Sequence, residues 1–512
     1  METFSWPVLA IFMGTVGIFG ILVGKWWQQK RAYRLLATLP SPPKHWLFGN
    51  MLQLSAAVNK QQFSQFLFDW AQKLGPIYIL WANIPLVIVS KSHVIETILT
   101  KEIKEGTVMR SRLMSLGMND MTGPVIIGQT GTEWKWRRKG WNPQFNSSGI
   151  TNYANIINQA CQHTIKKIQE TPEIQTDFVF VELTMRIISC LLFGIPINPN
   201  EDSLEGPNLN IEELYKAQSV LSYRVLRIVS GEPVWMKYLP ILRTSREYWA
   251  ARKTIEDFLY PRVDLALKMR DEKRTDLEGA SPLFQKSMLV KIAANTPEYT
   301  RATLMSEAFL FLLGGTDSTA HSLAFTIGEL TLHPEIFQKA REEVDRVWQS
   351  QQGITTESLG KLTYLRAIFK ETLRLYTIGS GSGYVEVQRE FTIDKQTFPP
   401  GVQIFWSILS AGRDPDIYPH PDRFLPERWL DENGKEKVSV PTLVFGSGLH
   451  RCLGEHLALL EATIMLALLL RYFDWELING RASLEQWQQT MFIFPADRMP
   501  IRFKAREGVL LS

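Results

Sequence analysis

The chain has 512 residues, of which 45% are hydrophobic and 21% charged, a composition that excludes wholesale disorder and favours a globular protein. Lys and Arg number 56 against 52 Asp and Glu, so the net charge of +4 argues against a nucleic-acid backbone as the main partner. Cys161, Cys190 and Cys452 are too few and too scattered for a disulfide framework or a four-thiolate zinc site, and three reduced thiols are expected instead.

The first predicted element is a membrane-spanning helix. Residues 4–24 form an uncharged run of 21 residues, long enough as a helix to cross a bilayer core of about 30 Å. Trp26 and Trp27 follow at once, and a basic cluster up to Arg34 lies on the same side, which places the following chain in the cytosol. A cleaved signal peptide is the alternative, but the apolar run is long for one and the basic cluster follows it.

The rest of the chain is predicted to be one large, mainly α domain with a minor β part (α+β). We expect a boundary between an anchor with its basic flank at 1–38 and a catalytic domain at 39–512, because the proline-rich stretch 39–43 cannot be helical. Helical periodicity dominates residues 130–350. Alternating apolar residues predict short β segments at 77–81, 86–90, 384–406 and 491–503.

An aromatic and basic helix is predicted around residues 133–138. Trp134 and Arg138 are spaced i, i+4 and therefore share one face of it. A basic helix usually presents a solvated face, but tryptophans interleaved with arginines make this less expected here. Two interpretations are equally compatible with Lys135, Arg137 and Lys139: simple solvation, and a basic docking face for an acidic partner.

A long, mostly apolar helix is predicted at 304–330, interrupted by Gly314-Gly315 and then by Asp317, Ser318 and Thr319. Polar side chains and glycines in a buried helix are locally unfavourable, and such conflicts are expected at functional sites. Hydroxyl groups can hydrogen-bond to earlier carbonyls, open the helix and admit water. A kinked core helix without chemistry is an equal alternative for this segment alone.

Glu371 and Arg374 are spaced i, i+3 in an amphipathic helix, so their charges share one face. An ordinary surface ion pair of little energetic value is the simplest interpretation. The segment 424–429, which contains Arg428, follows downstream.

The segment from Phe445 is a glycine-rich loop that leads into an apolar helix starting near Leu453. Cys452 therefore precedes a helix N-terminus, where the macrodipole and free N–H groups are expected to lower the thiol pKa. Gly446 and Gly454 allow close approach of a flat partner, and a thiolate here suits an axial bond to haem iron. A buried structural cysteine, or a nucleophile with His450 as its base, is an alternative that the loop alone leaves open.

Together these segments resemble cytochrome P450 enzymes over essentially the whole chain. Phe445-x-x-Gly-x-x-x-Cys452-x-Gly454 is similar to the family's haem signature, and Glu371-x-x-Arg374 and Trp134-x-x-x-Arg138 are similar to its other motifs, in the family's order. The resemblance implies haem b (iron protoporphyrin IX) with Cys452 as metal ligand. The resemblance implies that the cofactor is bound by Cys452, Trp134, Arg138, His450, Phe445, Gly446 and Gly454. It implies structural roles for Glu371, Arg374 and Arg428 and a proton relay through Asp317, Ser318 and Thr319. The implied pocket residues are Leu310, Phe311 and Gly314.

The implied activity is a monooxygenase that inserts one oxygen atom from O2 into a lipophilic small molecule. No G-x-G-x-x-G fingerprint is present, so electrons are expected from a separate reductase of the NADPH–cytochrome P450 reductase type. The implied setting is the endoplasmic reticulum bilayer with the catalytic domain in the cytosol. The alternatives are a haem-thiolate isomerase or dehydratase that acts without O2, and a non-catalytic haem sensor.

Ser318 departs from the family's more usual threonine, and His450 stands where membrane-bound members often carry arginine. The usual propionate-binding arginine near Tyr384 is missing, with Arg389 as the nearest substitute. The resemblance therefore leaves the substrate and the subfamily open.

Overall fold

The structure is a computed structural model that describes residues 34–82, 85–146, 149–150, 153–197, 210–274, 280–351, 356–379, 383–437 and 443–509. The predicted anchor at 4–24 lies outside these residues. Within the described ranges, no helix is long and apolar enough to cross a bilayer.

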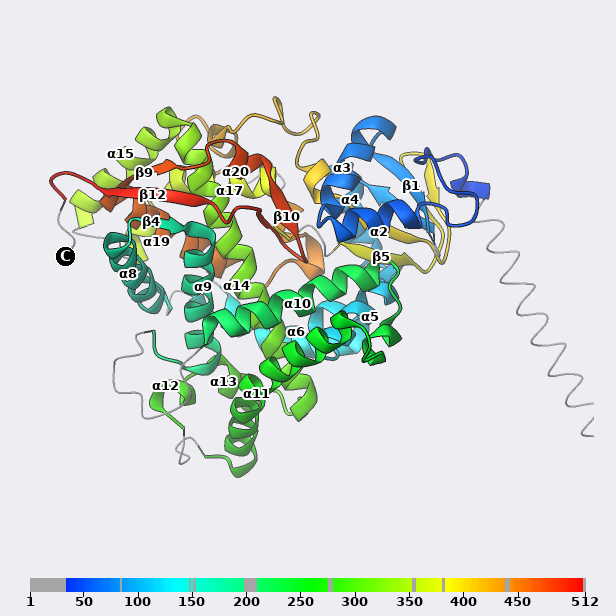
Figure 1. The fold of residues 1–512 in the computed structure, drawn as a ribbon, viewed down its shortest axis with the longest axis horizontal. Helices are drawn as coiled ribbons and strands as arrows, with labels where there is room; N and C mark the ends of the chain where they lie inside the picture. The colour runs from blue at the N-terminus through cyan, green and yellow to red at the C-terminus, as the bar shows by residue number, and fades with distance from the viewer. Residues whose placement is uncertain are drawn as a thin grey trace, which may run out of the picture.

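Helices form most of the molecule (Figure 1). The helices and helical turns are α2 (Met51–Asn59), α3 (Phe63–Leu74), α4 (Ser92–Thr97), η1 (Ile98–Glu102), α5 (Arg112–Met121), η2 (Ile126–Gly128), α6 (Gly131–Phe145), α8 (Ala154–Glu170), α9 (Thr176–Phe193), α10 (Ile211–Val229), η3 (Val234–Tyr238), α11 (Arg243–Glu272), α12 (Pro282–Gln285), α13 (Met288–Asn295), α14 (Arg301–Leu332), α15 (Pro334–Gln351), α16 (Thr356–Leu359), α17 (Thr363–Tyr376), α18 (Ile408–Ala411), η4 (Pro426–Trp429), η5 (Leu443–Phe445), η6 (Gly448–His450), α19 (Glu455–Tyr472) and α20 (Ala482–Glu485).

Strands make up the minor part. They are β1 (Ile77–Trp81), β2 (Pro85–Val89), β3 (Val108–Arg110), β4 (Glu173–Gln175), β5 (Tyr384–Val387), β6 (Phe391–Ile393), β7 (Gln396–Phe398), β8 (Gln403–Trp406), β9 (Phe473–Leu477), β10 (Trp487–Gln489), β11 (Ile493–Pro495) and β12 (Pro500–Ala505). The mainly α architecture and all four predicted β regions are confirmed.

The largest described sheet has the strand order β1-β2-β8-β5-β3. The predicted hairpin is its antiparallel β1–β2 pair, with Ile79 opposite Val87, and β8 adds to β2 in parallel. In Figure 1 this sheet lies at one end of the molecule beside α2, α3 and α4, and most of the other helices lie toward the opposite end.

Helix α14 runs through the helical part and packs most extensively against α9, with α11, α17 and α19 also beside it. Its side chains are buried around almost the whole circumference, as expected of a helix that is apolar on all sides. A capping box between Thr300 and Thr303 begins it, and it continues unbroken to Leu332. The predicted long helix is confirmed, and the glycines and polar residues that interrupt its apolar sequence do not break it.

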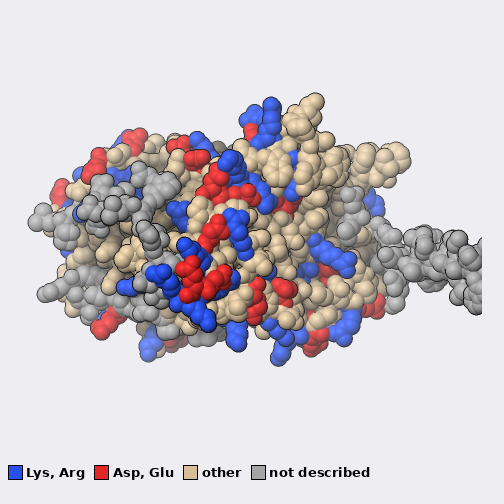
Figure 2. All heavy atoms as spheres, turned by 90° about the horizontal axis from the view of Figure 1, so that it is seen from below, with Lys and Arg blue, Asp and Glu red and all other residues tan. Residues whose placement is uncertain are grey.

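Acidic and basic side chains alternate over the face shown in Figure 2. No extended surface of one sign appears on this face, in keeping with the small net charge of +4.

Candidate active site

The loop around Cys452 is shaped by glycines and by one backbone hydrogen bond. Gly446 and Gly448 have φ of +71° and +63°, in the left-handed region that favours glycine. A Cβ at Gly448 would lie 2.6 Å from the carbonyl oxygen of Leu99, so the loop packs too closely against η1 for any side chain. The amide of Cys452 donates to the carbonyl of Phe445 at 2.8 Å, which closes the loop just before the N-cap of α19.

The residue Cys452 is exposed overall, but neighbouring protein atoms largely desolvate its sulfur. Burial raises its pKa, and this outweighs the N–H of Gly454 that hydrogen-bonds to the sulfur and the nearby charges of Arg138 and Arg451. The predicted lowering of this pKa by the helix N-terminus is therefore wrong for the protein alone, since desolvation is the larger effect. A bound metal cation supplies the charge that deprotonates a coordinating thiol.

Helix α6 packs on this loop through the two residues that sequence spacing placed on one face. The ring centroids of Trp134 and His450 lie 4.6 Å apart, and Arg138 Nη1 donates to the carbonyl of Arg451 at 2.7 Å. The structure therefore brings Trp134, Arg138, His450 and Cys452 together.

A cluster of cationic and donor groups surrounds this junction. Arg110, at the end of β3, is partly buried with an inaccessible Nε, and desolvation together with Arg138 lowers its pKa to about 10. Burial and the charges of Arg110 and Arg138 lower the pKa of His450 to about 3. Among the described residues, no carboxylate is paired with Arg110 or Arg138, and Arg110 Nε and His450 Nδ1 have no hydrogen-bond partner. We call the two cations Arg110 and Arg138, together with the neutral ring of His450, the cationic cluster.

Arg110 was missed by sequence reasoning, because nothing in the sequence around it indicates that β3 ends at the Cys452 loop. Arg389, the substitute considered from the sequence, is exposed and donates to the carbonyl of Glu105.

The proposed docking face on α6 needs correction. Arg137 is 3% exposed and forms an ion pair of 2.7 Å with the buried Glu307 of α14, so it cannot contact a partner protein. Burial raises the pKa of Glu307 to about 7, with Arg137 opposing that shift. Lys135 and Lys139 are exposed.

The acid and alcohol of α14 differ in their surroundings. Asp317 is 2% exposed, and its Oδ1 accepts a hydrogen bond of 2.7 Å from Gln218 Nε2 of α10. Burial raises the pKa of Asp317 to about 6, against the opposing charge of His321. Ser318 Oγ donates to the carbonyl of Gly314 at 2.7 Å, which confirms the predicted bond back to an earlier carbonyl.

The other predicted residues of α14 have mixed environments. Thr319 is buried and Leu310 is partly buried. A side chain built at Gly314 meets nothing within 4 Å, so open space lies beside it. Phe311 packs between aromatic rings, with its centroid 4.0 Å from that of Trp141 and 5.2 Å from that of Phe145.

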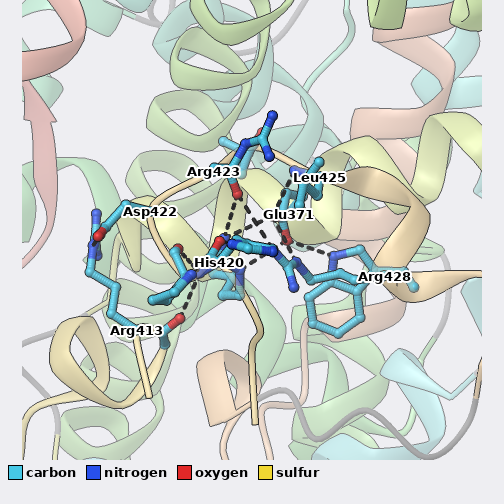
Figure 3. A network of polar contacts seen from close by, with 12 residues as sticks. Glu371, Arg413, His420, Asp422, Arg423, Leu425 and Arg428 are labelled. Atoms are coloured by element: carbon cyan, nitrogen blue, oxygen red, sulfur yellow. Dashed lines mark hydrogen bonds and ion pairs between the residues drawn. The ribbon is translucent and has the colours of Figure 1, made fainter. Parts of the chain in front are cut away.

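Glu371 lies at the centre of a buried network that joins α17 to the segment before η4 (Figure 3). Its two oxygens accept from Arg374 at 2.7 and 2.9 Å and from Arg428 at 2.9 Å. Leu425 N and Trp429 Nε1 each donate to it at 2.9 Å. The surface ion-pair interpretation of Glu371 and Arg374 is therefore wrong, because both are almost fully buried.

Arg374 also ties down the chain that wraps around the network. It donates to the carbonyls of Gly412 at 2.7 Å, Pro421 at 2.6 Å and Arg423 at 3.1 Å. The extra donors from Leu425 and Trp429 were not foreseen, since only the folded loop brings them to Glu371.

A family model for cytochrome P450 matches residues 39–503. Isoflavone 2'-hydroxylase of Glycyrrhiza echinata is 27% identical, covering 92% of this chain and 90% of its own. Cytochrome P450 4c21 of Blattella germanica is 24% identical over 97% and 99% of the two chains. Cytochrome P450 4V2 of Homo sapiens is 24% identical over 94% and 91%.

Proposed function

This chain belongs to the cytochrome P450 family, whose members are haem-thiolate monooxygenases that bind haem b, and on that premise we propose that it is a membrane-anchored monooxygenase acting on a lipophilic small molecule. The reaction inserts one oxygen atom from O2, as a hydroxylation or an epoxidation. One observation carries the proposal, namely the cationic cluster beside the Cys452 thiol.

The cationic cluster fits the two propionate groups of haem b. Cations that are partly withdrawn from water favour an anionic partner, and the described residues supply no carboxylate to Arg110 or Arg138. Arginine and carboxylate form strong charge-assisted hydrogen bonds, and Arg110 Nε and His450 Nδ1 are free to donate or accept them. Cys452 is exposed, and Arg138 of the cluster acts on its thiol, so together they suit an anionic, metal-bearing, flat ligand.

Each residue then has a role in holding the cofactor. Cys452 would bind the haem iron through its sulfur, which accepts a hydrogen bond from the N–H of Gly454. Trp134, Arg138, His450 and Arg110 would hold the propionate groups, while Phe445 and Gly446 would shape the loop that carries Cys452. Haem b, when bound, supplies the redox chemistry that activates dioxygen.

Proton delivery is the task of α14. Asp317 is the acid, because burial raises its pKa to about 6 and lets its carboxyl both hold and release a proton near neutral pH. Ser318 is the alcohol: its Oγ donates to Gly314 and keeps lone pairs that accept a hydrogen bond from water. Thr319 extends this polar stretch. Leu310 and Gly314, one turn apart and within two turns before the relay, would face a lipophilic substrate, and Phe311, packed against Trp141 and Phe145, would support that wall from behind.

The membrane association is supported by exposed apolar side chains as well as by the anchor at 4–24. Two neighbouring groups project from the surface: Trp46, Leu47, Phe48 and Leu52 before and in α2, and Trp235, Tyr238, Leu239, Ile241 and Trp249 around η3. The groups are adjacent because Gly231 lies against Met51 and Tyr223 donates to Val58. Exposed aromatic residues suit a bilayer interface, here that of the endoplasmic reticulum.

Electrons come from a separate NADPH-dependent reductase. Lys135 and Lys139 provide exposed positive charge on α6, the helix that contacts the Cys452 loop. Charges at such a rim speed the encounter of the two proteins more than they strengthen the complex.

The test is turnover of a lipid and terpenoid mixture by the full chain in vesicles with a surrogate reductase, NADPH and isotope-labelled O2. We expect at least one product that carries one labelled oxygen atom and that depends on both reductase and NADPH. Turnover of a hydroperoxide without reductase, and without label, would instead indicate an isomerase. Haem reduction with no product from any substrate would contradict an enzymatic role.

A further inference from the structure

A buried triad lies behind Asp317. We propose that His321, oriented by Asp177 and Arg498, is a positioning residue that sets when the carboxyl of Asp317 takes up and releases its proton. The inference rests on the proposed role of Asp317 as the acid of the relay, and it assigns to His321 a function that its isolated place in the sequence does not suggest.

His321 lies one helical turn after Asp317 in α14, so both side chains leave the same face of the helix. Its ring is 1% exposed, and Nδ1 lies 2.6 Å from Oδ1 of Asp177, which is fully buried in the first turn of α9. Among the described residues, Nε2 of His321 has no hydrogen-bond partner. The aspartate therefore fixes the orientation of the ring one turn from Asp317.

Arg498 completes the triad from the turn between β11 and β12. Its Nη1 donates to Asp177 Oδ2 at 2.9 Å and lies 3.0 Å from the hydroxyl of Tyr215 on α10. Its backbone is left-handed, with φ of +62°, and its carbonyl accepts from the amide of Asp177 at 3.1 Å. Arg498 is part-exposed, so the triad extends from the protein surface to the interior.

The charged and titratable groups around Asp317 come from four parts of the fold. His321 comes from its own helix, Asp177 from α9, and Arg498 from the β11–β12 turn. Helix α10 contributes Gln218, which is hydrogen-bonded to Asp317, together with Tyr215, which contacts Arg498. Of these charged groups, His321 and Arg498 favour the ionised carboxyl of Asp317, and Asp177 opposes it.

The charge of His321 acts on the carboxyl of Asp317 across one turn of α14. An imidazolium one turn away helps Asp317 to give up its proton, whereas a neutral ring lets Asp317 keep it. At a separation of about 6 Å between i, i+4 side chains and an effective dielectric constant near 20, loss of that charge moves the titration of Asp317 upward by roughly one to two pH units.

The experiment compares His321→Asn with the wild-type chain. Asparagine keeps a donor near the position of Nδ1 for Asp177 but cannot titrate. The infrared band of the protonated Asp317 carboxyl, identified by its absence from Asp317→Asn, is followed against pH in the substrate-free holoprotein. His333→Asn is the control, because His333 lies on the same helix about 24 Å further along, at 1.5 Å per residue.

We expect the midpoint of the Asp317 titration to rise by roughly one to two pH units in His321→Asn and to stay unchanged in His333→Asn. Arg498→Gln, on the partly exposed member of the triad, should shift the midpoint in the same direction by less, and it serves as a second test if His321→Asn does not fold. An unchanged midpoint in folded His321→Asn overturns the inference.

A second readout separates this inference from the proposed function. If Asp317 is the acid of the relay, the pH at which NADPH consumption and product formation become uncoupled shifts with its titration. A shifted infrared midpoint with an unshifted coupling profile would retain the triad's control of Asp317 and reject Asp317 as the proton donor.

Discussion

Replacing Glu371 by Gln should destabilise the protein by about 3–5 kcal/mol, the cost of breaking a buried ion pair by removing one partner. Contacts at the site give a similar figure. In wild type, Oε1 accepts from Arg374, Arg428 and Leu425, and Oε2 accepts from Arg374 and Trp429. Whichever oxygen becomes the amide nitrogen, two or three buried donors face a donor, at about 1–3 kcal/mol each.

Urea unfolding of the Glu371→Gln holoprotein, followed by circular dichroism, measures this change. The matched control is Glu427→Gln in η4, whose carboxylate is half-exposed and pairs with the exposed Lys339 at 2.8 Å. Such a pair contributes less than about 1 kcal/mol. A Glu371→Gln protein within about 1 kcal/mol of wild type would refute the view that this network holds the segment from α17 to η4 in place.

Three further outcomes test the site. Cys452→Ala should abolish the thiolate-type spectrum of the reduced carbonyl complex, whereas Cys190→Ala, at a buried thiol elsewhere, should retain it. Ser318→Ala should consume reductant faster than it forms product. The control Ser322→Ala removes a hydroxyl that donates to the Ser318 carbonyl, and its reductant consumption and product formation should stay coupled. Coupled turnover by Ser318→Ala would place the relay elsewhere. Burial raises the pKa of Asp317 from 3.8 to about 6, so its ionisation makes wild type less stable as pH rises through that window. The stability of Asp317→Asn relative to wild type should therefore grow by roughly 2.5 kcal/mol between pH 4 and pH 7 in denaturant titrations, and a constant difference contradicts the raised pKa.

Local patterns predicted what depends on neighbours in sequence. The alternation that indicated the β1–β2 hairpin and the i, i+4 spacing of Trp134 and Arg138 need only strand or helix geometry, and both appear as expected. Helical spacing alone did not identify the buried side of α6. Arg137 points inward because it forms an ion pair with the buried Glu307, which lies 170 positions later in the chain.

Electrostatics was the least predictable part from sequence. The helix N-terminus at Cys452 is a local signal, but desolvation by the assembled fold outweighs it and raises the thiol pKa. Arg110 and the partners of His321 come from strands and helices far away in the chain, so only the tertiary structure brings them to the site.

The cationic cluster also bears on how the polypeptide matures in a cell. Desolvating positive charges during folding costs free energy, and an anionic ligand that binds only the folded chain offsets that cost. We therefore expect porphyrin supply to set how many newly made copies escape proteolysis, so that a shortage lowers abundance before it alters the turnover of each surviving molecule.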